Sequence, residues 1–244
     1  DRLLPNALFD GLACFAAAPD SGLVFGAHRR IDAGGQPIGD IVYQPVGAAP
    51  YQVLLRRNVI GIHAAVMYDR ARLVALGGFD ATLKRCEDYD VYLRLARTTP
   101  LASHPNPVAE YRWHGGNMSA NHREMLSWTL RVHGRERQTA LATPLTADAW
   151  RQGRRVWRNY YAEQILGATR QRWAADHSIG RAVHGMFEGM SASPGTTLRA
   201  LLRAARRRLG GPRTANAGDA PPHRAIGSVS FGDLGGVKPI SDDF

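Results

Sequence analysis

The pattern of apolar and polar positions divides the chain into two parts. Up to about residue 120, segments with the period of a strand alternate with segments with the period of a helix, which predicts an α/β domain over residues 1–120. Over residues 121–209 apolar residues recur at helical spacing and strand signals vanish, so we expect an α-helical region there. Residues 210–225 have linker composition, and residues 226–244 become apolar and Gly-rich again.

Within the first part, the pattern assigns each segment to a helix, a strand or a turn. We expect a helix in 3–22, a strand at 23–32, a turn at 33–37, a helical piece at 51–58, a buried strand at 59–70, a short helix at 71–79, an acidic helix at 87–97 and an extended segment at 101–114. In the second part we expect helices at 121–141, 146–190 and 196–209.

Charge is concentrated in the helical part. The formal net charge of the chain is +10, and residues 121–213 hold 17 Arg against 6 acidic residues, a balance of +11 that leaves the rest near neutral. Two cysteines make no disulfide framework, which favours a reducing compartment. There is no apolar run of the ~20 residues that span a bilayer and no signal peptide. Because the chain begins at Asp1 without Met, we expect a fragment of a larger protein.

The acidic stretch "CEDYD" invites two interpretations. Glu87, Asp88 and Asp90 open a helix, where carboxylates accept hydrogen bonds from free backbone N–H groups and suit the helix dipole. The alternative is a carboxylate held rigidly for chemistry, as a general base must be.

Three motifs occur in order around this stretch. They are Gly77-Gly78-Phe79-Asp80, then Glu87-Asp88-x-Asp90, then Tyr111-Arg112-x-His114-x-x-Asn117-x-Ser119. The ordered set resembles the second half of a family 2 glycosyltransferase with the GT-A fold, over residues 1–120. The resemblance implies a partial GT-A (Rossmann-like) sheet that lacks its N-terminal nucleotide-binding half, so we expect this piece to bind donor poorly and to be inactive alone.

The resemblance also implies roles for individual residues. Asp88 would be the base that deprotonates the acceptor hydroxyl, supported by Glu87. A Mg²⁺ or Mn²⁺ ion would bind mostly through residues ahead of the chain, with Asp1 as the tail of that acidic cluster and His114 beside the metal and diphosphate. Arg112 would contact phosphate, and Asn58 and His63 would lie on the acceptor side. Each has a structural alternative: His114 and His63 as strand histidines, Arg112 as a partner of an acid.

The last residues carry a second resemblance. "VSFGDLGGVKPISDDF" is similar to a lead-in found before some class I methyltransferase domains, which implies S-adenosylmethionine only in a downstream domain. Gly235 and Gly236 stand where that lead-in has an Arg pair. The alternative is a mostly disordered tail.

The basic helix at 196–209 admits three interpretations: a solvated face, a surface for an anionic membrane or an acidic glycan, or a nucleic-acid surface. No base-reading motif supports the last, so we expect no nucleic-acid partner.

We therefore expect an inverting glycosyltransferase that moves a sugar from a nucleotide-sugar donor to a glycan or lipid-linked acceptor, for a bacterial cell-envelope or exported polysaccharide. We expect it in the cytoplasm, peripheral at the inner face of the membrane. The alternatives are a basic helical binding or scaffold module, and the junction of a methyltransferase with a degenerate glycosyltransferase half.

Overall fold

The protein is a mixed α/β structure in which the helices outnumber the strands. A computed structural model describes residues 1–113 and 121–208, so His114, Asn117, Ser119 and the tail predicted over 210–244 lie outside the described residues. The strands are β1 (Arg2–Leu3), β2 (Leu23–Ile31), β3 (Pro37–Val42), β4 (Val66–Tyr68) and β5 (Leu101–Arg112). The helices are α1 (Ala7–Ala17), α2 (Pro50–Arg56), the 3₁₀ turn η1 (His63–Ala65), α3 (Arg70–Ala75), α4 (Glu87–Ala96), α5 (His122–Arg135), α6 (Arg137–Ala140), α7 (Pro144–Asp176), α8 (Ile179–Ala192) and α9 (Pro194–Arg208).

One mixed sheet organises the first part. Its strand order is β1-β5-β2-β3, with β4 also paired to β2. The central pair β2 and β5 is parallel, and the remaining pairs are antiparallel. β4 pairs with the first residues of β2 and β3 with the last, so these two short strands share one edge. The parallel pair is joined by a long crossover that contains α2, α3 and α4, as parallel strands require.

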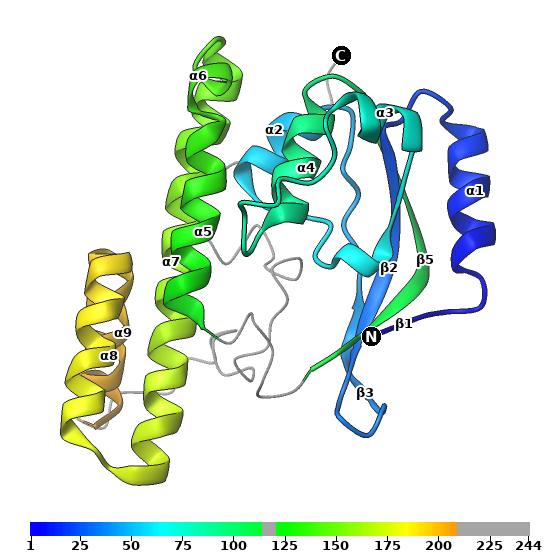
Figure 1. The fold of residues 1–244 in the computed structure, drawn as a ribbon. Helices are drawn as coiled ribbons and strands as arrows, with labels where there is room; N and C mark the ends of the chain where they lie inside the picture. The colour runs from blue at the N-terminus through cyan, green and yellow to red at the C-terminus, as the bar shows by residue number, and fades with distance from the viewer. Residues whose placement is uncertain (114–120, 209–244) are drawn as a thin grey trace.

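The elements stack in layers on either side of this sheet. Figure 1 shows α1 on one side, α2 and α4 on the other, α5 and α7 beyond them, and α8 with α9 farthest from the sheet. Leu23 and Phe25 of β2 share a core with the buried residues of α4, including Tyr92 and Leu93. The same core continues into α7 through Trp157, Tyr161 and Ile165. The helical region therefore contributes to the core that fixes α4.

The periodicity predicted most of these elements. The expected helices at 51–58, 71–79 and 87–97 and the strands at 23–32 and 101–114 are confirmed. The strand expected at 59–70 is wrong over most of its length, because only Val66–Tyr68 is a strand and a 3₁₀ turn precedes it. The helix expected at 146–190 is interrupted at His177, whose backbone is left-handed, with φ 52°. Strand β3 was not predicted.

The outer side of α1 is apolar. Leu8, Phe9 and Leu12 are exposed there, Phe9 at 75%. The helix packs on β5. Within the described residues, β1 pairs with the outer edge of β5 at Ala109 and Glu110. The outer side of α1 is therefore an exposed apolar surface within the described residues.

Three helices meet at one backbone carbonyl, that of Leu55 in α2. The buried His133 side chain of α5 donates through Nε2 to this oxygen at 2.7 Å. Burial lowers the pKa of His133 to about 4, so the ring is neutral and can hold this tautomer at neutral pH. A Cβ on Gly153 of α7 would lie 1.8 Å from the same oxygen. Glycine is therefore the residue that lets α7 approach α2.

Gly153→Ala should destabilise the protein. The added methyl group overlaps the Leu55 carbonyl and forces α7 away, so we expect a loss of about 3 kcal/mol in the free energy of unfolding. Gly134→Ala is the matched control, because a Cβ at Gly134 of α5 meets nothing within 4 Å. Alanine there should stabilise by up to ~1 kcal/mol through helix propensity. Urea unfolding followed by circular dichroism measures both. Equal effects in the two variants would contradict the packing argument.

Candidate active site

The acidic helix α4 begins at a strained residue. Cys86, its N-cap, has a left-handed backbone with φ 60°, which non-glycine residues seldom adopt. Glu87, Asp88 and Asp90 follow in the first turn. Positions two apart on a helix point about 200° away from each other, so Asp88 and Asp90 face opposite sides. They have different surroundings and must be considered separately.

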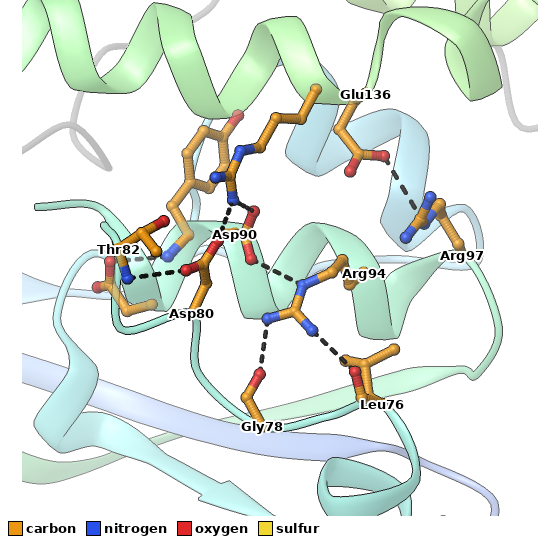
Figure 2. A network of polar contacts seen from close by, with 11 residues as sticks. Leu76, Gly78, Asp80, Thr82, Asp90, Arg94, Arg97 and Glu136 are labelled. Carbon is orange, nitrogen blue, oxygen red and sulfur yellow. Dashed lines mark hydrogen bonds and ion pairs between the residues drawn. The ribbon is translucent and has the colours of Figure 1, made fainter. Parts of the chain in front are cut away.

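Asp90 is buried in a network of ion pairs (Figure 2). Its carboxylate accepts from Arg94 Nε at 2.7 Å and lies 3.3 Å from Nη1 of Arg135, which belongs to α5. Arg94 also donates to the backbone oxygens of Leu76 and Gly78, at 3.1 and 2.7 Å. Asp90 thus holds the turn before α4, the helix itself and α5 together. This role goes beyond that of a first-turn cap.

The Gly-Gly-Phe-Asp turn is fixed by the same network. Gly77 and Gly78 have φ of 86° and 67°, values that favour glycine. Asp80 pairs with Arg135 at 2.7 Å and accepts from the Thr82 backbone N–H at 2.8 Å. Hydrogen bonds from Thr82 and from Arg135 lower the pKa of Asp80 to about 2, so it stays ionised. The first two motifs of the sequence are therefore one connected unit.

Asp88 faces the other way, toward β4 and η1. It lies deep among neighbouring side chains yet keeps part of its surface open to solvent. Burial raises the pKa of its carboxyl group above the ordinary value, and the charge of Glu87 raises this pKa further. The hydrogen bond from the Tyr89 backbone N–H and the charge of His63 lower the same pKa, but less than burial raises it. A carboxylate whose pKa is raised and which solvent can reach is suited to accept a proton.

Aromatic rings surround this carboxylate. His63 stacks on Phe79 with ring centroids 5.3 Å apart and an angle of 24° between the planes, and Tyr68 meets both rings edge-on. Phe79 is 39% exposed, so part of its ring remains available. Phe79 comes from the Gly-Gly-Phe-Asp turn and His63 from η1, two segments that the fold brings together beside α4.

Two buried tyrosine hydroxyl groups lie close to each other near Asp88. The hydroxyls of Tyr68 and Tyr92 interact with one another, and within the described residues neither makes a hydrogen bond of standard geometry. Burial first, and then the charge of Asp88, raises the pKa of Tyr92, so its hydroxyl keeps its proton. The two hydroxyl groups therefore form a small polar pair beside the Asp88 carboxylate.

The two acceptor-side predictions lie in the same loop but differ in environment. His63 contributes to the group around Asp88. Asn58 is buried, and its side-chain oxygen accepts from the Ile60 backbone N–H at 3.0 Å, which shapes the loop that leads to η1. Its prediction as an acceptor contact is not tested by this arrangement.

The donor-side predictions lie at the end of the sheet where β1 and β5 pair. An Asp1 side-chain oxygen accepts from the Arg112 backbone N–H at 2.9 Å, so these two residues are adjacent. Arg112 Nη1 donates to the Asp32 and Ala33 carbonyls of the β2–β3 turn, at 3.1 and 2.6 Å. His114 lies outside the described residues. η1, which contains His63, packs against both β1 and β5.

The described residues do not build a metal centre. No three His, Cys, Asp or Glu side chains within residues 1–113 and 121–208 gather in a way that could hold an ion. Asp1 alone does not supply the set of oxygen ligands that Mg²⁺ needs, so we derive no step through a metal.

Sequence reasoning missed the aromatic residues and Arg135. Tyr92 could have been found, because it follows Asp88 by four positions and therefore lies on the same helix face. Tyr68 and Phe79 are separated from Asp88 by turns that periodicity does not resolve. No local signal pairs Arg135 with carboxylates 45 and 55 residues earlier.

Asp90→Asn should destabilise the protein markedly. It removes the charge that both Arg94 and Arg135 face, and breaking a buried pair on one side costs about 3 kcal/mol or more. A capping role alone would predict a few tenths of a kcal/mol. Asp40→Asn on exposed β3 is the control and should change stability by less than ~0.5 kcal/mol. Thermal unfolding distinguishes the cases, and a near-neutral Asp90→Asn would contradict the network.

Comparison with known proteins does not place the chain in a family. No family model matches it, and no curated protein matches it. None of the helices within the described residues has the length and apolar character of a membrane span.

Proposed function

We propose that this chain carries the acceptor-side half of an inverting family 2 glycosyltransferase, with Asp88 as general base. The single observation that supports this best is the arrangement around Asp88: a partly accessible carboxylate with a raised pKa, beside His63, the partly exposed Phe79 ring and the Tyr68–Tyr92 hydroxyl pair. The ordered motifs of the sequence agree with the same function.

In the proposed reaction the acceptor hydroxyl attacks the anomeric carbon of a nucleotide-sugar. Its proton passes to Asp88 as the new glycosidic bond forms, and the bond to the nucleoside diphosphate breaks. Such a base contributes ~10²–10⁴ in rate. The raised pKa of Asp88 increases its affinity for the proton, and the Asp90 network holds α4 still. The exposed part of the Phe79 ring offers an apolar surface for the acceptor beside the base.

The donor is proposed to bind where Asp1 and Arg112 meet, with His114 following in the chain. The Arg112 backbone is already oriented by Asp1. The acceptor is proposed to be a glycan or lipid-linked sugar of a cell-envelope or exported polysaccharide, with Asn58 shaping the loop and His63 beside the base. The methyltransferase lead-in of the tail remains a prediction from its sequence alone.

Asp88→Asn should abolish most of the transfer without unfolding the protein. Asparagine preserves size and hydrogen bonding to the Tyr89 N–H but cannot take a proton, so we expect transfer to fall by ~10²-fold or more while donor affinity stays the same. The measurement is sugar transfer from a panel of nucleotide-sugars by the natural polypeptide that includes these 244 residues. Asp148→Asn, an exposed carboxylate of α7, is the control. Near-normal transfer by Asp88→Asn would show that the base lies elsewhere.

The pH dependence of transfer should shift in opposite directions for the two neighbours of Asp88. A base works only when ionised, so transfer should fall as the pH drops through the pKa of Asp88, which lies above its ordinary value. His63 lowers that pKa, so His63→Gln should move the acid limb to higher pH. Glu87 raises it, so Glu87→Gln should move the limb to lower pH. Shifts in the same direction, or no shift, would remove Asp88 as the titrating group.

A further inference from the structure

Helix α8 places its small residues inside and its large apolar residues outside. Gly185, Gly189 and Ala192 are buried. A Cβ on Gly185 would lie 2.0 Å from Thr169 of α7, so close packing against α7 explains the small residues on this face. The large apolar residues are exposed instead: Ile179 at 72%, Val183 at 54%, Phe187 at 67% and Met190 at 42%. An ordinary surface helix has the reverse arrangement.

These exposed residues form one stripe. At 3.6 residues per turn, positions 179, 183, 187 and 190 fall within an arc of about 80°. The buried positions 185, 189 and 192 are centred about 150° away on the same basis. The stripe therefore faces away from α7, where the described residues offer it no covering element. We name it the α8 stripe.

Helix α9 repeats the arrangement beside α8. Thr196 and Thr197 are buried, while Leu198, Leu201 and Leu202 are exposed at 55%, 42% and 52%. Arg199, Arg203 and Arg206 follow the spacing i, i+4, i+7 and are exposed, so they form a basic row next to the leucines. Because α8 and α9 pack on each other and lie farthest from the sheet, the apolar and basic rows occur on one outlying part of the molecule (Figure 1).

The charge of this surface is strongly positive. Residues 176–208 contain six Arg and two acidic residues, a net +4 (6 − 2 = 4). Asp176 is paired with Arg181, and Glu188 is paired with Arg123 at 3.0 Å and faces His184 at 3.2 Å. Glu163 of α7 lies near Arg199 and Arg203, and one carboxylate does not neutralise the row.

We propose that the α8 stripe and the leucines and arginines of α9 form a surface that binds the face of an anionic lipid bilayer. An apolar row that enters the headgroup region beside arginines that meet anionic headgroups is the arrangement of an in-plane amphipathic helix. A second copy of the chain fits this surface less well. A two-fold contact brings the same surface of both copies together, so the arginine row of one copy would lie near the arginine row of the other and repel it. The proposal does not depend on the function of Asp88.

The test is sedimentation of the full chain with lipid vesicles. Vesicles of phosphatidylcholine with 30% phosphatidylserine are the probe (about the anionic fraction of a charged leaflet), and pure phosphatidylcholine vesicles are the comparison. We expect binding to the anionic vesicles that weakens as salt rises from low to high concentration, and little binding to the neutral ones. Equal, salt-independent binding to both would overturn the role of the arginines.

Two pairs of variants locate the surface. Arg199→Gln, Arg203→Gln and Arg206→Gln together should lower the vesicle partition coefficient about 100-fold, at a factor of about five for each Arg. The matched control changes Arg151, Arg155 and Arg158 to Gln, three exposed arginines of α7 with the same spacing and charge. Phe187→Asp should weaken binding at least tenfold, while Phe9→Asp on the apolar side of α1 should not.

Vesicle binding by these variants either supports or overturns the proposed membrane surface. Loss of binding in the α8 and α9 variants, with unchanged thermal unfolding and intact controls, supports the proposal. Equal loss in the controls overturns the assignment of the surface. If the wild-type chain ignores vesicles and instead forms a dimer that Phe187→Asp dissociates in light scattering, the stripe is an interface between copies and the proposal fails.

Discussion

The candidate site depends on the requirement that a buried carboxylate be neutralised. Asp90 lies in the interior, and an unpaired charge there would cost several kcal/mol. Two arginines meet it, one from the same helix and one from α5. Because Arg94 also holds the carbonyls of the Gly-Gly-Phe-Asp turn and Arg135 holds Asp80, satisfying one charge places three segments. The position of Phe79 and the start of α4 follow from that placement.

This answers why so much negative charge opens a buried helix. The carboxylates two positions apart point to opposite sides, and only one of them is neutralised by arginine. Asp90 anchors the helix. Asp88 faces His63, Tyr68 and Tyr92, where burial raises its pKa more than His63 lowers it. A cap at the start of α4 does not require a second carboxylate in such surroundings, which supports the proposed role of Asp88 as a base.

The sequence predicted what local patterns encode. Periods of two and 3.6 residues found β2, β5, α4 and the helical region, and paired glycines found the end of α3. It failed where the cause is distant in sequence. From the sequence, Asp90 has the position of a first-turn cap, but in the structure it pairs with Arg135 of α5. The segment 59–70 has the composition of a strand, but part of it forms η1, which packs on β1 and β5. The grouping of His63, Phe79 and Tyr68 is a product of tertiary packing that no spacing rule reports.

The helical region has two different sides, and its composition follows from both. Toward the sheet, Gly153 and His133 meet the Leu55 carbonyl, so α7 and α5 are fixed to the core by contacts that tolerate no larger or charged side chain. Away from the sheet, Gly185 and Gly189 of α8 lie close to side chains of α7, and Val183 and Phe187 are exposed. A helix that merely covered the core would place those large side chains inward, where each would gain ~2 kcal/mol of burial. The inverted order therefore indicates that the outer side of α8 is itself a binding surface, rigidly attached through α7 to the layer that positions Asp88.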